Sequence, residues 1–244
     1  MVKDGDHNHV NELQRLSSVA GWYFDEQLDI DKQLIRFGYE DFKPYIRGPE
    51  GLELGIGDGQ MTRLLMQDFA CLTIVDGVAE LLASVPDATS LVKVYALFEE
   101  FEPDRQFNTI VMSRVLDLVK QPVALLERAK NWLAPGGRIL MLVPNAYSIH
   151  RLVGVKLGLL KDPCELNGRS RVLGSRRVYT PESFRQDIER AGLQIVKIGG
   201  TFFKPLPQQH IQECWTSEMV QGFYELGKDF PENAAEIYAV CELP

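Results

Sequence analysis

The sequence predicts an α/β fold in which helices cover both faces of a mostly parallel sheet. Three observations support this prediction. Short apolar runs alternate with amphipathic helical patterns over residues 51–143, which is typical of parallel strands joined by helices. The run at residues 138–143 is almost wholly apolar, as expected for a strand that is buried on both faces. A glycine-rich turn follows the first apolar run, and open parallel sheets bind ligands at such strand ends.

Hydrophobic periodicity locates the individual elements in order. Residues 29–46 place their apolar side chains on one helical face ahead of the first strand. Tyr23 and Phe24 precede that helix, and they either contact a ligand or pack onto the core. Strands are expected at residues 51–55, 72–75, 91–95, 107–112, 138–143, 193–198 and 236–243.

Glycine and proline mark the predicted ends of several helices. The triplet Pro135-Gly136-Gly137 is expected to end the helix before the fifth strand, because glycine favours a helix C-terminus. Thr180 is expected to cap a later helix that closes at Gly192.

The chain is predicted to form one domain with additions around the sheet, since 244 residues suit an α/β domain of ordinary size. The alternation breaks after residue 144. Residues 152–160 are expected to be helical and to lead into a polar loop, and residues 208–228 are expected to be helical as well. The predicted parts are an N-terminal helical cap, a ligand-binding half, a substrate-side insert, and final strands and helices, at residues 1–48, 49–143, 144–180 and 181–244.

Composition excludes several classes of protein. Hydrophobic residues make up 45% and charged residues 25%, as in soluble globular proteins, and no apolar run reaches the length of a membrane span. The polar N-terminus lacks a secretory signal, so a cytoplasmic location is expected. A net charge of −8 argues against nucleic-acid binding. The four cysteines are far apart in sequence and favour neither a zinc site nor a disulfide framework.

The most informative stretch is the glycine-rich turn at residues 51–62. Glycines 55, 57 and 59 can adopt positive φ angles and allow backbone amides to approach a ligand. The helix that follows adds free N–H groups. A dinucleotide-binding fingerprint would need a third glycine where Gln60 or Thr62 stands. The turn is therefore expected to hold a ligand other than a dinucleotide.

The pattern Glu53-x-Gly55-x-Gly57-x-Gly59 resembles the first motif of class I S-adenosylmethionine (SAM)-dependent methyltransferases. The resemblance covers about residues 45–200 and implies a Rossmann-like seven-stranded sheet whose last strand is antiparallel. It also implies SAM as cofactor and S-adenosylhomocysteine (SAH) as product. The runs at residues 143–151 and 176–180 resemble those of a ubiquinone-methylase-like group of bacterial small-molecule methyltransferases.

The same resemblance implies which residues contact SAM. Asp76, which closes the second strand, is expected to bind the ribose diol, and the alternative is a solvated loop aspartate. Leu97 and Phe98 would face adenine with Glu99 at its edge, unless they only pack their loop. Arg114 would face the SAM carboxylate. The implied set is Glu53, Gly55, Gly57, Gly59, Met61, Thr62, Asp76, Gly77, Leu97, Phe98, Glu99, Ser113 and Arg114.

A metal is not expected. Many relatives have Val-Leu-Glu-His-Val after the fourth strand, and some branches use these acids with the histidine as metal ligands. Here Asp117 and Leu118 replace the glutamate and the histidine.

His150 is the best-placed histidine for acid–base catalysis, because it follows the fifth strand and imidazole has an ordinary pKa near 6.5. It may equally cap a helix or bind a backbone carbonyl, so both interpretations stay open. Tyr147 and Tyr179 are further candidate proton donors.

The substrate-side insert is rich in basic residues, which contrast with the acidic chain. This excess predicts an anionic acceptor that carries phosphate or carboxylate, although a solvated loop paired to distant acids explains it as well. The basic residues are Arg151, Lys156, Lys161, Arg169, Arg171, Arg176 and Arg177.

Three functions are consistent with the sequence. The leading one is methyl transfer from SAM to an oxygen or nitrogen of a small, anionic molecule, by a monomer or homodimer. The second is methylation of RNA or protein, which the absence of an added basic domain and of an Asn/Asp-Pro-Pro-Tyr/Phe motif disfavours. The third is SAM binding without catalysis, as in a regulator.

Overall fold

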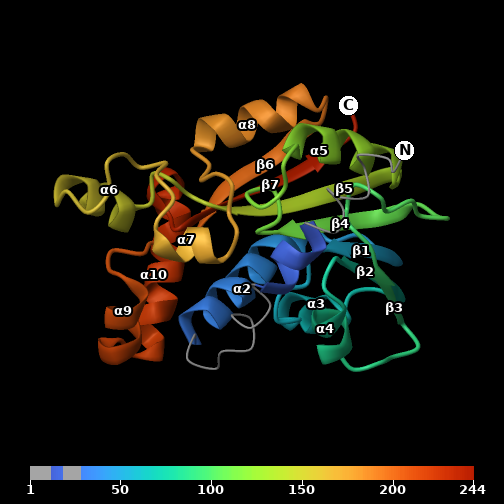
Figure 1. Ribbon diagram of the computed structural model, residues 1–244, viewed down its shortest axis with the longest axis horizontal. Helices are drawn as coiled ribbons and strands as arrows, with labels where there is room; N and C mark the ends of the chain where they lie inside the picture. Colours follow the sequence, from blue (N-terminus) through green and yellow to red (C-terminus); the bar gives the residue numbers. More distant parts are fainter. Residues whose placement is uncertain (1–11, 19–28) are drawn as a thin grey trace.

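A computed structural model describes residues 12–18 and 29–244 of the chain. Tyr23 and Phe24 lie outside the described residues. The core is a seven-stranded sheet with strand order β3-β2-β1-β4-β5-β7-β6 (Figure 1). The strands are β1 (Glu50–Leu54), β2 (Cys71–Asp76), β3 (Leu91–Tyr95), β4 (Phe107–Ser113), β5 (Leu133–Pro144), β6 (Gln194–Thr201) and β7 (Glu236–Glu242).

The direction of the strands confirms the predicted architecture. The pairs from β3 across to β5 are parallel, and β7 runs antiparallel to both β5 and β6. This is the seven-stranded sheet of class I methyltransferases. No helix in the two described ranges is both long and apolar enough to cross a membrane.

Helices cover both faces of the sheet, as the apolar strands require (Figure 1). One core packs α5 and α8 against the sheet, and the opposite core contains side chains of α2, α3 and α4. A third cluster joins α2 to α9 and α10 through side chains such as Phe37 and Tyr224. The helices are α2 (Asp29–Phe42), α3 (Gln60–Leu65), α4 (Ala79–Ser84), α5 (Pro122–Asn131), α6 (Ile149–Lys156), α7 (Gly168–Val172), α8 (Pro181–Arg190), α9 (Gln208–Cys214) and α10 (Ser217–Asp229), with 3-10 turns η1 (Lys43–Tyr45) and η2 (Pro231–Asn233).

The prediction that Pro135-Gly136-Gly137 ends a helix is wrong. Helix α5 already ends at Asn131, and the triplet lies inside β5. There the pairing with β4 shifts between Phe107 and Thr109, so the triplet belongs to a bulge. Gly136 supplies the positive φ of +71° that the bulge requires.

Two further segments differ in detail from the prediction. The polar loop after α6 contains the short helix α7, which the Asn167 side chain caps by accepting the Ser170 N–H. Residues 208–228 form two helices instead of one, since the backbone of Trp215 and Thr216 is extended. Thr180 caps α8 as predicted, through a reciprocal pair of hydrogen bonds with Ser183.

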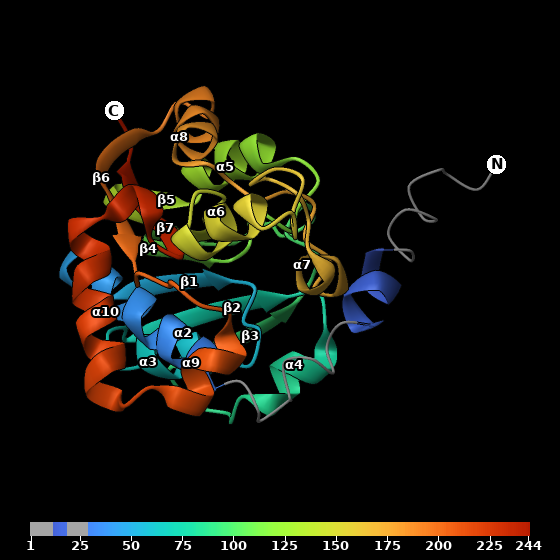
Figure 2. The ribbon, with the colours of Figure 1, turned by 90° about the vertical axis from the view of Figure 1, so that its left-hand side faces the viewer.

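The covering segments meet at one edge of the sheet. Helices α2, α6, α7 and α9 lie at the left of Figure 1, where the parallel strands end, and Figure 2 looks onto this edge. The additions to the sheet thus surround the place where a ligand of such a fold binds.

Candidate functional site

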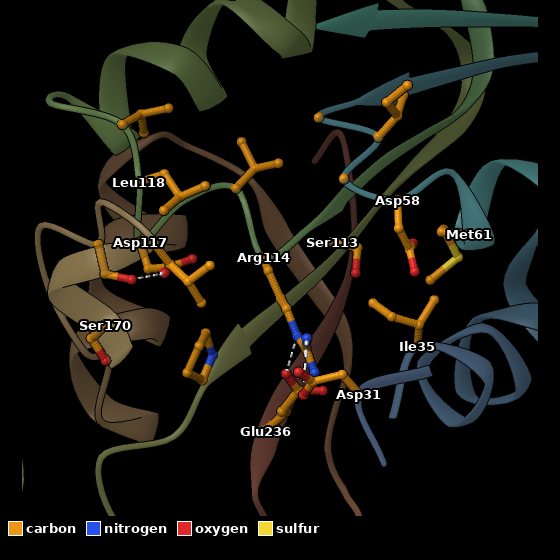
Figure 3. A pocket seen from close by; sticks show the side chains of 18 of the residues that line it. Asp31, Ile35, Asp58, Met61, Ser113, Arg114, Asp117, Leu118, Ser170 and Glu236 are labelled. Atoms are coloured by element: carbon orange, nitrogen blue, oxygen red, sulfur yellow. Dashed lines mark hydrogen bonds and ion pairs between the residues drawn. The ribbon is translucent and has the colours of Figure 1, made fainter. Parts of the chain in front are cut away.

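A cavity of about 310 Å³ opens at the carboxyl edge of the sheet. Ten of the thirteen predicted cofactor residues and His150 line it: Gly55, Gly57, Met61, Asp76, Gly77, Leu97, Phe98, Glu99, Ser113 and Arg114. Figure 3 shows Arg114 crossing the middle of the cavity, with Asp58 and Met61 to one side and Asp117 and Ser170 to the other. We call these the glycine side (Gly55, Gly57, Asp76, Leu97 and Phe98) and the polar side (Asp117, His150, Ser170, Lys204 and Glu236).

The glycine turn has the geometry that its sequence predicts. Gly55, Gly57 and Gly59 have φ angles of +73°, +54° and +74°, a region that other residues rarely adopt. A Cβ at Gly55 would lie 2.9 Å from Cγ2 of Val115. Both the backbone angle and the lack of space therefore require glycine beside the cavity.

Asp76 holds the turn and faces the cavity at once. Its Oδ2 accepts the backbone N–H of Ile56 at 3.0 Å, and its Oδ1 accepts that of Val78 at 2.9 Å. Burial raises the pKa of Asp76, and the two amides counteract that effect. Because a carboxylate can accept about four hydrogen bonds, Asp76 retains acceptor capacity for a ligand.

Gly77 and Leu97 bring a separate segment over this end of the cavity. A Cβ at Gly77 would lie 2.8 Å from Cδ1 of Leu16 and 3.2 Å from Cδ2 of Leu97. The glycine thus lets the helix at residues 12–18 approach the loop after β3. Leu97, Phe98 and Glu99 line the cavity beneath it, so an apolar wall with one acidic edge stands where adenine was predicted.

Three predicted cofactor residues, Glu53, Gly59 and Thr62, do not line the cavity. Glu53 is fully buried. Burial raises its pKa to about 8, with smaller contributions from the charges of Asp76 and Asp58, while the Thr62 hydroxyl acts in the opposite direction. Glu53 is therefore protonated at neutral pH.

Arg114 forms ion pairs with two carboxylates, which come from different elements of the fold. Its backbone has a positive φ of +57°, which directs the side chain across the cavity (Figure 3). Nε donates to Oε1 of Glu236 at 2.5 Å, and Nη1 lies 3.9 Å from Oδ1 of Asp31. Asp31 also pairs with Arg169 of α7. One network thus joins β4, β7, α2 and α7.

Asp117 is a buried carboxyl group on the polar side. The Ser175 hydroxyl donates to its Oδ2 at 3.0 Å, whereas Oδ1 has no hydrogen-bond partner within the described residues. Burial raises the pKa of Asp117 to about 6. Among the residues that the structure describes, no group of three or more His, Cys, Asp or Glu side chains could hold a metal ion.

His150 lines the polar side, on the first turn of α6. Burial lowers its pKa to about 3, and the charges of Lys204 and Arg151 add to this effect, while a hydrogen bond with the Lys204 backbone opposes it. Its Nδ1 is buried without a hydrogen-bond partner in the described part of the chain. The imidazole is therefore neutral at neutral pH and able to accept a hydrogen bond.

The structure places the two predicted tyrosines away from the cavity wall. Tyr179 is only 2% exposed, and its hydroxyl donates to Oδ2 of Asp187 at 3.0 Å. Tyr147 is 40% exposed, and its backbone N–H donates to the Asn145 side chain. Neither tyrosine therefore lines the space in which His150 and Asp117 lie.

Most arginines of the basic insert bind the chain's own backbone. Arg151 donates to the carbonyls of Pro163 and Glu165. Arg176 donates to the carbonyl of Leu118, and Arg177 to those of Leu116, Val119 and Lys120. Of the seven basic residues, only Arg151 and Arg169 line the cavity. These contacts hold the insert onto the sheet. The basic charge of the insert is therefore not direct evidence that the ligand is an anion.

Sequence reasoning missed Asp31, Lys204 and Glu236, which all line the polar side or its rim. A usable signal existed for two of them. Because β7 is antiparallel, it begins at the edge where the parallel strands end, so Glu236 at its start lies at that edge. Strand β6 runs opposite to β7 and ends at the same edge, so Lys204, which follows β6, lies there too.

Comparison with known proteins agrees with this geometry. The family model described as a methyltransferase domain matches residues 25–198. An uncharacterised protein of Methanocaldococcus jannaschii is 24% identical over 198 residues, which is 81% of this chain and 88% of that protein.

Three solved structures share the fold. The chain solved with the Haloferax volcanii Trm112 methyltransferase activator has a TM-score of 0.63 at 16% identity, covering 93% of this chain and 97% of that one. The N-methyltransferase NodS of Bradyrhizobium japonicum, in complex with SAH, has 0.59 at 13%, covering 94% and 98%. The DhpI–SAM–HEP complex has 0.63 at 15%, covering 99% and 100%. The chain belongs to the methyltransferase-domain family, with the fold of class I SAM-dependent methyltransferases.

Proposed function

We propose that this chain transfers a methyl group from SAM to an oxygen or nitrogen of a small molecule that binds on the polar side. The observation that carries this proposal is the continuity of the cavity. One space joins the glycine turn and Asp76 to the neutral His150 and the buried Asp117. Cofactor and acceptor can therefore meet out of bulk water.

The residues of the glycine side fit SAM. Asp76 has acceptor capacity left for a ribose diol, and Leu97 and Phe98 offer an apolar wall to adenine. The Ser113 hydroxyl is buried without a hydrogen-bond partner in the described part of the chain, so it is available to the methionine portion. Arg114 would lie beside that portion while bound to Glu236.

The chemistry divides between cofactor and protein. SAM supplies a methyl group already activated by its sulfonium, so the protein mainly aligns the acceptor, an effect worth about 7–11 kcal/mol. A hydroxyl or ammonium acceptor must also lose a proton. Asp117, whose pKa of about 6 makes it a stronger base than His150 in this space, is the proposed group that accepts the proton. Such proton transfer typically contributes about 10²–10⁴-fold. His150 is the proposed group that orients the acceptor, because its unpartnered Nδ1 can accept a hydrogen bond from it.

The surroundings of the polar side favour a small acceptor over RNA or protein. Residues of the helix at 12–18 and of α2, α6 and α7 line the cavity together with the strand ends. A segment of folded RNA or protein would have to displace these covers, whereas a small molecule need not. Because the two acceptor classes differ here only in their access to the cavity, the test includes macromolecules.

The experiment is a methyl-transfer screen with SAH release as readout. Phosphorylated, carboxylated and sugar acceptors form one arm, and bulk tRNA and a denatured protein digest form the other. We expect turnover in the small-molecule arm alone, together with a rise in melting temperature when SAM or SAH binds the folded state. Turnover confined to the macromolecular arm would contradict the proposed acceptor class. SAH binding without turnover in either arm would favour a non-catalytic regulator.

A further inference from the structure

Lys204 is a cavity residue whose cation has no counter-ion among the described residues. It follows β6, lines the polar side and is partly buried. Within the described residues, its ammonium group has neither a hydrogen bond nor an ion pair within 4 Å. The arginines nearby differ in this respect, since Arg114 pairs with Glu236 and Arg169 pairs with Asp31.

The charges around Lys204 leave one cation in excess, because Arg114 and Arg169 each pair with a carboxylate and Lys204 pairs with none in the described part of the chain. Burial and the charges of Arg169 on α7 and of Arg114, which follows β4, lower the pKa of Lys204 to about 8, and the charge of Glu236 on β7 opposes them. His150 on α6 also faces Lys204, and its neutral ring adds no charge there. The ammonium group of Lys204 is therefore the cation that an added anion would neutralise.

We propose that Lys204 binds the anionic group of the methyl acceptor, a carboxylate or a phosphate, on the polar side of the cavity. This inference rests on the proposed function and specifies its substrate class. The anion would then bind at Lys204 and not at the arginines of the basic insert, since Arg151, Arg176 and Arg177 are bound to backbone carbonyls. A lysine is suited to this role because its compact ammonium can bind either anion as a point charge.

Two other roles for Lys204 predict different behaviour. If Lys204 bound the SAM carboxylate, its loss would weaken SAH binding. If Lys204 removed the acceptor's proton, its loss would lower kcat and leave the acceptor KM unchanged. Anion recognition instead predicts unchanged SAH affinity and a response to anions that disappears with the charge.

The test compares the full chain with Lys204→Met, which keeps the length of the side chain and removes its charge. Lys197→Met is the matched control, because Lys197 lies on β6 with its side chain exposed. SAH affinity is measured by calorimetry. The melting temperature of the SAH-saturated protein is then measured with inorganic phosphate or with acetate, each against chloride at equal ionic strength.

We expect phosphate or acetate to raise the melting temperature of wild type and Lys197→Met but not that of Lys204→Met, with SAH dissociation constants within twofold. The anion that acts distinguishes a phosphate from a carboxylate acceptor. An equal response in Lys204→Met, no response to either anion in wild type, or tenfold weaker SAH binding in Lys204→Met would each overturn the inference. If circular dichroism shows that Lys204→Met is unfolded, Lys204→Gln replaces it.

A different result would contradict the proposed function itself. Wild-type protein that does not bind SAH at all would contradict the methyltransferase proposal itself, before any anion is added. Once an acceptor is identified, Lys204→Met should raise its KM at least tenfold and change kcat by less than threefold.

Discussion

Oδ2 of Asp76 accepts the backbone N–H of Ile56 at 3.0 Å, which ties the end of β2 to the glycine turn after β1. The same carboxylate lines the cavity. Asp76 is therefore both a support for the cofactor turn and a candidate ligand for the cofactor, and its substitution should affect binding and stability together.

Replacing Asp76 with alanine should weaken SAH binding at least tenfold. The change removes the proposed ribose acceptor and leaves the buried N–H groups of Ile56 and Val78 without a partner, and each unpaired group costs about 1–3 kcal/mol. Calorimetry gives the affinity, and urea unfolding gives the stability. Asp104→Ala is the control, since Asp104 is exposed on a distant loop. Unchanged SAH affinity would remove Asp76 from the site.

Replacing Glu53 with glutamine should flatten the dependence of stability on pH. The folded protein holds the Glu53 proton up to a pKa of about 8, whereas the unfolded chain releases it near the ordinary value of about 4.3. The native state therefore binds the extra proton in this window, and the free energy of unfolding falls as pH rises through it. Glutamine carries no such proton, so Glu53→Gln should gain stability relative to wild type between pH 5.5 and 8.5.

Urea unfolding at these two pH values measures the effect. Glu50→Gln is the control, because Glu50 begins the same strand and is only partly buried. A pH dependence of Glu53→Gln equal to that of wild type would show that Glu53 is ionised in the folded protein at neutral pH.

Local sequence patterns were sufficient to predict the positions of most strands of the sheet. Strand β3 occupies the predicted residues 91–95, because turn-forming residues bound its apolar run. The start of β5 was misplaced, since proline and glycine give the same local signal for a helix end and for a bulge. Only pairing with Phe107 on β4 distinguishes the two. Helix α7 was missed because only one of its five residues, Val172, has an apolar side chain that could show a helical period. Contacts of Arg169 with α2 and α9 help hold it in place.

Some residues of the site can be identified from a local motif, whereas others are brought together only by the tertiary structure. The glycine turn and Asp76 are consecutive in one strand–turn–helix–strand unit, and a motif can identify them. The network of Asp31, Arg114 and Glu236 joins three segments far apart in sequence, so it depends on strand order and on the antiparallel β7. The exposure of a charged side chain is likewise set by tertiary contacts. The sequence of the basic insert therefore does not reveal that its arginines are bound to backbone carbonyls.

Replacing Tyr179 with phenylalanine should reduce stability without lowering turnover. The hydroxyl is bonded to Asp187 of α8, and a hydrogen bond of this kind contributes about 1 kcal/mol. Burial and the neighbouring Asp187 also raise the pKa of Tyr179 far above its ordinary value, which makes it a poor proton donor. Urea unfolding and kcat measure the two effects. A fall in kcat of tenfold or more with normal stability would return Tyr179 to the active site.

Replacing His150 with alanine should lower kcat while leaving SAH affinity within twofold. His150 lines the polar side, away from Asp76 and the glycine turn, and the hydrogen bond that its Nδ1 can accept from the methyl acceptor would be lost. Since its pKa is lowered to about 3, His150 is neutral from pH 5 upward and should cause no inflection in the rate between pH 5 and 8. An acid limb near pH 6 should instead come from Asp117 and disappear in Asp117→Asn. His210→Ala, on the exposed side of α9, is the matched control. Wild-type kcat in His150→Ala would mean that the imidazole only holds α6 against the Lys204 backbone, and that other groups orient the acceptor.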